Sequence, residues 1–302
     1  MDNYGIATPL IAVVGETAAG KSAAALALAE EFSGEIINAD SWQIYRGMDI
    51  GTAKPSLDER QRVPHHLFDI VDPNQDFTAA VYKRMAKTVI NDIQQRGNLP
   101  ILVGGTGLYI DGVLFDYSFT PPGNPGERER WQRLDIPELL AEIERRGYSL
   151  TGVDTRNKRR LIRLLENRGQ MPTQSQMPET TLAIGVQTTS RAQLRRNIEE
   201  RVEQMFRAGL KHEVQELVQT YGWEVEAMKG VGYREFYDYF EGEQSLAATK
   251  RRIIKNTLDL AKKQRTWFKR NRHIVWVESI EAAQSLTADF MANLPRPSSE
   301  RS

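Results

Sequence analysis

Cysteine is absent from this chain of 302 residues, so disulfides, thiolate zinc sites and cysteine nucleophiles are excluded. The chain has only four histidines, which disfavours a structural zinc site as well. No run reaches the roughly 18 apolar residues that a membrane span needs. The apolar stretch Leu10–Val14 is shorter than the core of a signal peptide, and we expect a cytoplasmic protein with no membrane partner. Net charge is absent too, because 40 Lys and Arg balance 40 Asp and Glu, so only the distribution of charge can indicate a partner.

Apolar runs and helical patterns alternate along the first hundred residues. The runs Leu10–Gly15, Glu35–Ala39 and Leu99–Val103 are short and typical of buried parallel strands. Between them, Lys21–Phe32 and Thr78–Arg96 have the composition and spacing of helices. This order of strands and helices predicts an α/β fold with a doubly wound parallel sheet.

The texture of the sequence changes after about residue 116. A cluster of breakers, Pro121–Gly126, precedes the charged helical segments Glu127–Arg146 and Thr155–Arg168. Strand-like texture returns at Leu182–Gln187, and the chain from Arg191 is mostly helical, with a last short strand at His273–Val277. We therefore predict a core of residues 1–116 and 182–302 with a helical C-terminal part, interrupted by a helical insertion domain at 117–181.

A glycine-rich loop follows the first strand and fits the pattern G-x-x-x-x-G-K-[ST]. Such loops turn their backbone N–H groups toward phosphate oxygens, and the helix that follows adds the positive end of its dipole. The lysine supplies a mobile cation, and the hydroxyl of Ser22 suits Mg²⁺. The loop predicts phosphate binding without specifying ATP or phosphoryl transfer. Its residues are Gly15, Glu16, Thr17, Ala18, Ala19, Gly20, Lys21 and Ser22.

Asp40 follows the second strand, at the edge of the sheet where open α/β folds bind ligands. Three roles are open to it: a ligand for Mg²⁺, a general base, or the cap of a turn. The third strand ends in Gly104-Gly105-Thr106 and not in the carboxylate expected of an enzyme that hydrolyses nucleotides. One carboxylate and one neutral hydroxyl beside a phosphate site favour group transfer with a diphosphate leaving group.

Six blocks of sequence in a fixed order then point to a family. They are Gly15–Ser22, Asn38–Pro55, Pro64–Ile70, Val103–Ile110, Gly230–Tyr237 and Leu260–Asn271. In these blocks the chain resembles the bacterial tRNA dimethylallyltransferases. The resemblance implies a P-loop NTPase-like fold, dimethylallyl diphosphate as donor, Mg²⁺ as cofactor and the anticodon stem-loop of tRNA as partner. The implied acceptor is N6 of the adenosine that follows the anticodon, flipped out of its stack.

The resemblance also implies roles for individual residues. Asp40 would be the catalytic base, Thr106 would lie near the base and the diphosphate, and Arg234 would contact the diphosphate and the RNA. The other positions that match tRNA contacts are Ser41, Trp42, Gln43, Arg128, Arg159, Arg160, Leu161, Ile162, Arg163, Lys229, Gly230, Val231, Gly232 and Tyr233.

Two basic clusters agree with an RNA partner. Ten Lys and Arg and a single acid, Asp259, lie between Thr249 and Arg272, interleaved with aromatic residues. Such a stripe is typical of a phosphate-binding surface, although a solvated helix face gives the same pattern. In the second cluster, Arg156, Arg160 and Arg163 are spaced to share one helix face.

Two other functions are compatible with parts of the sequence. A P-loop kinase of small molecules would use ATP at the same loop, but the missing acid after Val103 and the basic stripe argue against it. A non-catalytic RNA-binding protein would not need Asp40 or the intact loop. We expect a monomer and infer no obligate protein partner.

Overall fold

The computed structural model describes residues 9–119 and 125–294. The chain divides into two compact units, Met1–Leu114 with Met177–Ser302 and Phe115–Gln176. The limits predicted for the insertion, 117 and 181, fall a few residues inside and beyond the second unit. Most of the breaker cluster that suggested the first limit, residues 121–124, lies outside the described part of the chain.

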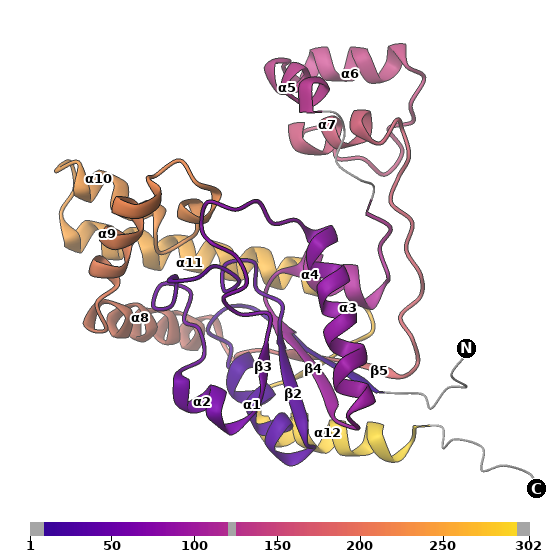
Figure 1. The fold of residues 1–302 in the computed structure, drawn as a ribbon, viewed down its shortest axis with the longest axis vertical. Coiled ribbons are helices and arrows are strands. Elements are labelled where there is room, and N and C mark those ends of the chain that lie inside the picture. The colour runs from indigo at the N-terminus through magenta and orange to yellow at the C-terminus, as the bar shows by residue number, and fades with distance from the viewer. Residues whose placement is uncertain (1–8, 120–124, 295–302) are drawn as a thin grey trace, which may run out of the picture. The chain divides into compact units, whose positions relative to one another are not determined.

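A six-stranded sheet forms the centre of the first unit (Figure 1). Every pair of neighbouring strands is parallel, in the order β3-β2-β4-β1-β5-β6. The strands are β1 (Leu10–Gly15), β2 (Gly34–Asn38), β3 (His65–His66), β4 (Leu99–Gly104), β5 (Thr181–Val186) and β6 (Ile274–Val277). The predicted parallel sheet is confirmed. Strand β3 was missed because two residues are too few to form a pattern.

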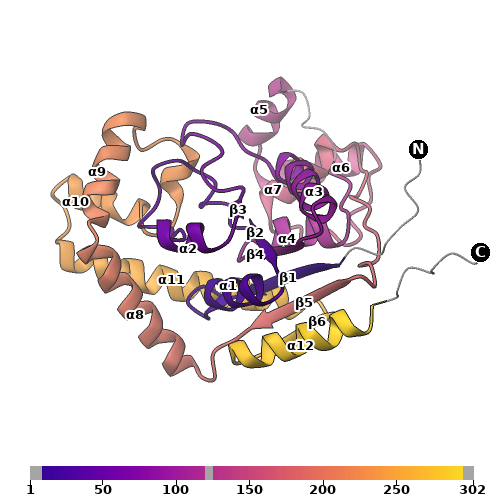
Figure 2. The same ribbon diagram turned by 60° about the horizontal axis from the view of Figure 1, so that its bottom comes forward.

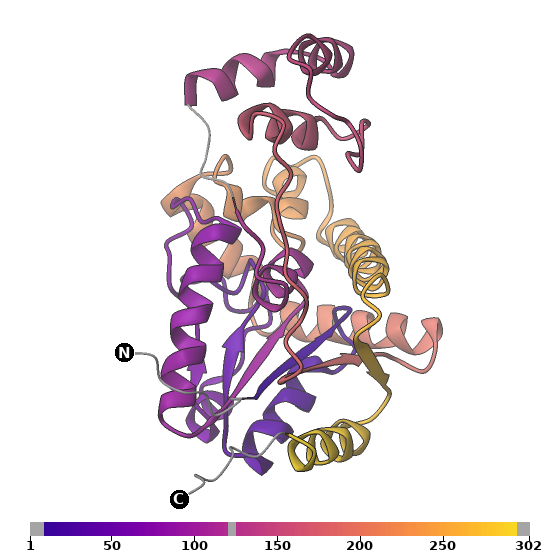
Figure 3. The same cartoon turned by 90° about the vertical axis from the view of Figure 1, so that its right-hand side faces the viewer.

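Helices cover both faces of this sheet, as Figures 2 and 3 show for α1 and α12 on one side and α3 on the other. Ile11 and Val13 of β1 belong to the core beneath α1 and α12, so the alternate residues Ala12 and Val14 face the opposite layer. The helices of this unit are α1 (Lys21–Glu31), α2 (Leu57–Arg62), α3 (Ala79–Gln95), α4 (Gly107–Leu114), α8 (Arg191–Arg207), α9 (Leu210–Tyr221), α10 (Tyr237–Phe240), α11 (Leu246–Phe268) and α12 (Ile280–Ala292).

A second hydrophobic core joins α8, α9 and α11 to the segment that follows β2. Ile44 and Met48 of that segment are buried together with Ile198 of α8, Val214 of α9 and Ile253 of α11. Figure 2 shows these late helices gathered at one side of the sheet. This core brings residues from the last third of the chain to the loops at the carboxyl ends of the strands.

The second unit contains α5 (Pro125–Arg133), α6 (Ile136–Arg145) and α7 (Lys158–Glu166) around its own small core. The first predicted helical segment is divided, because Asp135 begins α6 with a capping box. One prediction was wrong here. Asn157 caps α7, so Arg156 precedes the helix and does not share a helical face with Arg160 and Arg163. In the ranges 9–119 and 125–294, every helix is too short or too polar to cross a bilayer.

Candidate functional site

Three loops meet at the carboxyl edge of the sheet because β2, β4 and β1 are neighbours. The loop after β1 is the glycine-rich loop, the loop after β2 contains Asp40, and the loop after β4 contains Thr106. Gly104 permits the last two to touch, since a Cβ at this position would lie 2.1 Å from the carbonyl oxygen of Ala39. The loops predicted to bind the ligand are therefore adjacent in space.

The glycine-rich loop has the backbone that its glycines were expected to allow. Gly15 has a φ of 140°, and a Cβ there would lie 2.3 Å from the carbonyl oxygen of Val186. Gly20 begins α1 in the left-handed region, with a φ of 96°. The N–H groups of the first turn of a helix have no acceptor within it and are available to an anion. Ser22 lies exposed in that first turn.

Lys21 is folded against the same loop, where its Nζ donates a hydrogen bond to the carbonyl oxygen of Glu16 at 2.8 Å. Burial, with a smaller contribution from the charge of Arg201, lowers the pKa of Lys21 to about 8, while Asp40 and Glu16 oppose this shift. A buried ammonium group with a lowered pKa favours anion binding, because the negative charge of the anion compensates for the water that the ammonium has lost.

Asp40 and Thr106 are held by a short network of hydrogen bonds. Asp40 Oδ1 accepts from the N–H of Trp42 at 2.9 Å, so Asp40 does form a turn, one of the three roles left open. Thr106 Oγ1 accepts from the N–H of Ser41 at 3.0 Å and donates to Ser41 Oγ at 3.1 Å. This hydrogen bond uses Oδ1, so Oδ2 of the carboxylate is a second acceptor in the proposed site.

A cavity of about 510 Å³ opens beside these loops. Asp40, Thr106 and Arg234, the three predicted catalytic residues, all line it. So do six further residues predicted to bind diphosphate or RNA: Thr17, Ser41, Trp42, Lys229, Val231 and Gly232. The wall of the cavity formed by α8 and α11 is partly apolar and contains Ile198, Val202, Met205, Ile253 and Leu260. The cavity thus combines a polar edge with an apolar wall.

Arg201 of α8 also lines the cavity and was missed by the sequence analysis. Its Nη2 donates to the carbonyl oxygen of Thr52 at 3.3 Å. Burial lowers the pKa of this guanidinium, and the charge of Asp40 opposes that effect. In the sequence, Arg201 is one of several charged residues of a polar helix, and no local pattern distinguishes it.

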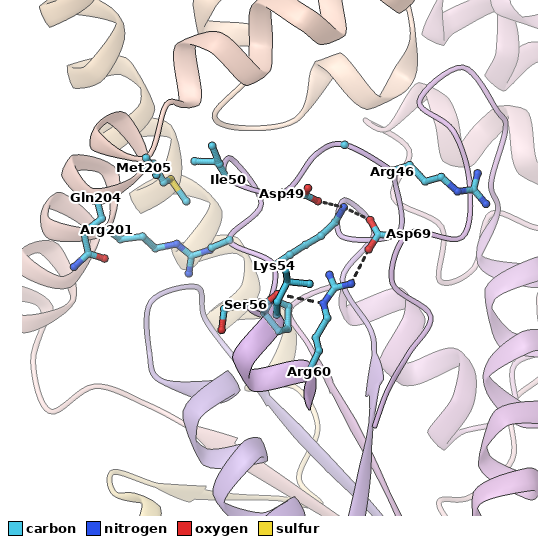
Figure 4. Close-up of a pocket in the computed structure, with 15 residues that line it drawn as sticks. Arg46, Asp49, Ile50, Lys54, Ser56, Arg60, Asp69, Arg201, Gln204 and Met205 are labelled. Atoms are coloured by element: carbon cyan, nitrogen blue, oxygen red, sulfur yellow. Dashed lines mark hydrogen bonds and ion pairs between the residues drawn. The ribbon is translucent and has the colours of Figure 1, made fainter. Parts of the chain in front are cut away.

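A second cavity, of about 750 Å³, shares Arg201 and Met205 with the first. Figure 4 shows that Lys54 and Arg60 of this cavity are engaged by carboxylates. Lys54 Nζ lies 2.7 Å from Asp49 Oδ1 and 2.5 Å from Asp69 Oδ1, and Arg60 Nη1 lies 2.8 Å from Asp69 Oδ2. These pairs brace the loop that carries Thr52, and so support the carbonyl to which Arg201 donates.

Several predicted contact residues have other roles in the structure. Gln43 does not line the cavity, and its Nε2 donates to the carbonyl oxygens of Thr52 and Ala53. Tyr233 is fully buried, and its hydroxyl donates to Glu213 Oε1 at 2.7 Å. These two side chains hold the loops in place and do not line the cavity.

Two predicted residues of the second unit also have a packing role. Leu161 and Ile162 are buried in its core, where their side chains pack against the other helices of the unit. The arginines of this segment differ, because Arg159 and Arg160 are exposed. Arg128 and Arg163 lie on opposite oxygens of the buried carboxylate of Glu166, each at 3.1 Å.

No group of three or more His, Asp or Glu side chains that could hold a metal occurs in the described ranges. Mg²⁺ does not require such a group, because it is commonly bound by one or two protein ligands together with the phosphates of a substrate. The hydroxyl of Ser22, in the first turn of α1, fits that mode.

Comparison with known proteins identifies the family. The model of the IPP transferase family matches residues 43–271. The chain belongs to the IPP transferase family. It is 44% identical over 287 residues to a tRNA dimethylallyltransferase of Geobacter metallireducens, covering 90% of this chain and 93% of the relative. A second tRNA dimethylallyltransferase, from Pelotomaculum thermopropionicum, is 40% identical, with 89% and 90% covered.

Solved structures of similar fold also include transferases that act on tRNA. A tRNA isopentenylpyrophosphate transferase of Bacillus halodurans matches with a TM-score of 0.74 and 32% identity, over 94% of this chain and 97% of that one. A eukaryotic dimethylallyltransferase acting on tRNA has a TM-score of 0.79 over 97% and 82% of the two chains, and at 24% identity this likeness concerns the fold. The resemblance and the P-loop NTPase-like fold predicted from the sequence are confirmed.

Proposed function

We propose that this protein transfers the dimethylallyl group of dimethylallyl diphosphate to N6 of the adenosine that follows the anticodon of tRNA. One observation carries the proposal. Asp40, Thr106, Thr17 and Arg201 converge on one cavity in a member of the IPP transferase family. A carboxylate, a hydroxyl and a buried cation beside an anion-binding loop are the groups that this reaction requires.

The donor diphosphate binds at the glycine-rich loop. The backbone N–H groups at the start of α1 and the cation of Lys21 hold its oxygens. Arg201 and Arg234 line the adjacent cavity and stabilise the charge that grows on the leaving group. Mg²⁺, held by Ser22 together with the diphosphate, would neutralise part of that charge. The apolar wall of α8 and α11 accommodates the dimethylallyl chain.

The acceptor amine approaches from the side of Asp40. The bond between N6 and C1 of the donor forms, the bond between C1 and the diphosphate oxygen breaks, and one proton of N6 passes to the carboxylate of Asp40. The products are the dimethylallylated adenosine, free diphosphate and the proton on Asp40, so atoms and charge balance. Because the exocyclic amine of adenine is a weak nucleophile, holding it in line with C1 supplies much of the acceleration. The hydroxyl of Thr106, bonded to Ser41, fixes the loop that orients the base.

RNA is bound by the exposed cations of α11 and by the arginines of the second unit, of which Arg159 and Arg160 are exposed. Only an unstacked base can enter a cavity of this kind, so the adenosine is flipped out. The protein acts in the cytoplasm as a monomer. A P-loop kinase is disfavoured, because the loop after β4 offers Thr106 where a kinase of this fold needs an acid, and because the family transfers prenyl groups.

The test supplies the protein with dimethylallyl diphosphate, Mg²⁺ and an anticodon stem-loop RNA with adenosine after the anticodon. Nucleoside mass spectrometry is expected to detect one dimethylallyl group on that adenosine. A matched stem-loop with purine riboside at the same position lacks the amino group and is expected to stay unmodified. If the RNA gains no mass and ATP is hydrolysed instead, the kinase function replaces this one.

A further inference from the structure

One side chain of α11 connects the two loops on which the proposed reaction depends. Gln264 Oε1 accepts a hydrogen bond from the N–H of Thr17 at 2.8 Å, and Gln264 Nε2 donates to the carbonyl oxygen of Gly105 at 3.1 Å. Thr17 belongs to the glycine-rich loop after β1, and Gly105 directly precedes Thr106 after β4. A single carboxamide therefore spans the gap between the diphosphate loop and the loop of Thr106.

The surroundings of Gln264 are shaped to admit this group. A Cβ on Gly105 would lie 2.2 Å from Gln264 Nε2, so only glycine allows the amide so close to the backbone. The bridge needs an acceptor at one end and a donor at the other. Glutamine meets both requirements, whereas glutamate lacks the donor and methionine lacks both.

Two neighbouring contacts also connect the glycine-rich loop to helices α8 and α11. Arg265, the next residue of α11, forms an ion pair with the buried carboxylate of Glu16. Asn197 of α8 donates through Nδ2 to the carbonyl oxygen of Ala18 at 3.0 Å. Three consecutive residues of the loop, 16 to 18, are thus held by late helices. The first N–H groups of α1 have no acceptor within the helix and are available to an anion.

We propose that Gln264 is a positioning residue that fixes the distance between the diphosphate loop and the loop of Thr106. The inference rests on the function proposed above. One loop holds the leaving diphosphate, and Thr106 of the other fixes the Asp40 loop that orients the acceptor base. Gln264 therefore sets the alignment of C1 with the attacking amine. Its loss affects the chemical step, whereas the contacts that bind each substrate on its own loop stay in place.

The experiment compares wild type with Gln264→Met and with a control variant, Thr266→Val. Thr266 is exposed on the same helix, and its Oγ1 donates only to the carbonyl oxygen of Lys262 within the helix. For each protein, kcat and the KM for dimethylallyl diphosphate are measured with the stem-loop RNA, together with the Kd for the RNA and the temperature of unfolding. We expect Gln264→Met to lower kcat roughly 10- to 100-fold, because a misalignment of about 1 Å has effects of this size. The donor KM and the RNA Kd are expected to change little, and Thr266→Val to match wild type.

Two other outcomes are decisive. A Gln264→Met protein that is folded and has the kcat of Thr266→Val overturns the positioning role, as does a loss that appears in KM alone. If Gln264→Met does not fold, Gln264→Glu decides, because it keeps the length and the acceptor for Thr17 but cannot donate to Gly105. Wild-type kcat in Gln264→Glu overturns the bridge, and a reduced kcat supports it. A wild-type protein that transfers no prenyl group contradicts the proposed function itself, which separates the two failures.

Discussion

The N–H of Ser41 donates a hydrogen bond to Thr106 Oγ1 at 3.0 Å, although 65 positions separate the two residues in the chain. The same hydroxyl donates to Ser41 Oγ at 3.1 Å. Because Asp40 directly precedes Ser41, the position of the proposed base depends on a side chain from another loop. Thr106 can therefore affect catalysis by holding the loop of Asp40 in place, even if Thr106 itself does not touch the substrate.

Replacing Thr106 by valine tests this relationship. Valine keeps the shape of threonine but removes the hydroxyl, so the N–H of Ser41 loses its acceptor and the loop of Asp40 can shift. We expect kcat for prenyl transfer to fall by roughly 10-fold or more, since positioning of this kind is worth a large share of the rate. Thr106→Ser keeps the hydroxyl and should recover most of the activity. A Thr106→Val protein with the kcat of wild type would show that this hydrogen bond does not position the loop of Asp40.

Asp40→Asn is predicted to lower kcat by roughly 10²- to 10⁴-fold, the contribution of a general base to a proton transfer. Asparagine has nearly the same shape, so the turn to the N–H of Trp42 is retained. Filter binding should give an unchanged Kd for tRNA. Asp259→Asn is the matched control, because Asp259 contributes a carboxylate to the same cavity from α11. Comparable losses in the two variants, or a Kd that rises as activity falls, would contradict the assignment of Asp40 as the base.

The pH dependence of donor binding should report the ionisation of Lys21. Its pKa is lowered to about 8, chiefly by burial, so the ammonium is present below pH 8 and is lost as pH rises through that value. The KM for dimethylallyl diphosphate is therefore expected to be flat below roughly pH 7 and to rise above pH 8. In Lys21→Met the KM should be high throughout, without this inflection. A wild-type profile without a rise between about pH 7 and pH 9 would show that Lys21 does not bind the donor as a cation.

Part of this site was predictable because a local pattern encodes it. The spacing of glycines and lysine identified the loop at Gly15–Ser22, and the rule that parallel strands end at one edge brought Asp40 and Thr106 beside it. Arg201 and Gln264 have no such signal. Each is a polar residue in a helix rich in charge, and its partners, Thr52, Thr17 and Gly105, lie far away in the sequence.

The same limit applies in the second unit. Leu161 and Ile162 belong to the expected RNA-contacting segment because they match the family's contact positions, and such a match does not show that sequential neighbours in a helix face different directions. Both are buried under α5 and α6. Arg156 was assigned to a helix that begins only at Lys158, because the cap at Asn157 is visible only once the backbone is known.

A hydrogen-bond network around Glu35, at the opposite end of the sheet from the cavity, contributes to the stability of the fold. This buried carboxylate accepts hydrogen bonds from Arg96 at 2.7 Å, from Asn98 at 2.7 Å and from His66 at 2.6 Å. Burial alone would raise its pKa, but these hydrogen bonds outweigh burial and lower the pKa below the ordinary value of 4.5. Its contribution to the free energy of unfolding is therefore present above pH 4.5 and lost as pH falls through the lowered pKa.

We expect Glu35→Gln to reduce the free energy of unfolding by about 1–3 kcal/mol at neutral pH, because Arg96, Asn98 and His66 lose their charged acceptor. The difference from wild type should shrink as pH falls below 4.5. Urea denaturation at several pH values measures both quantities. Glu30→Gln is the control, since the Glu30–Arg62 pair is exposed and should contribute only about 0–1 kcal/mol. A difference that grows toward acid pH would show that Glu35 is protonated in the folded state.

RNA binding by α11 predicts a particular dependence on salt. Lys255 and Lys262 are exposed and seven residues apart, so they lie on one side of the helix. A lysine that neutralises a backbone phosphate releases a counterion, which makes affinity fall with salt concentration. Replacing either lysine by alanine should weaken binding to the stem-loop and reduce the slope of log K against log salt by about 1. Lys87→Ala, on α3 and also exposed, is expected to leave the slope unchanged. If Lys255→Ala and Lys262→Ala lower affinity equally at all salt concentrations, α11 affects the RNA through folding or packing and not through its phosphates. If neither variant changes affinity or slope, the exposed side of α11 is a solvated face, and the phosphates of the RNA are bound elsewhere.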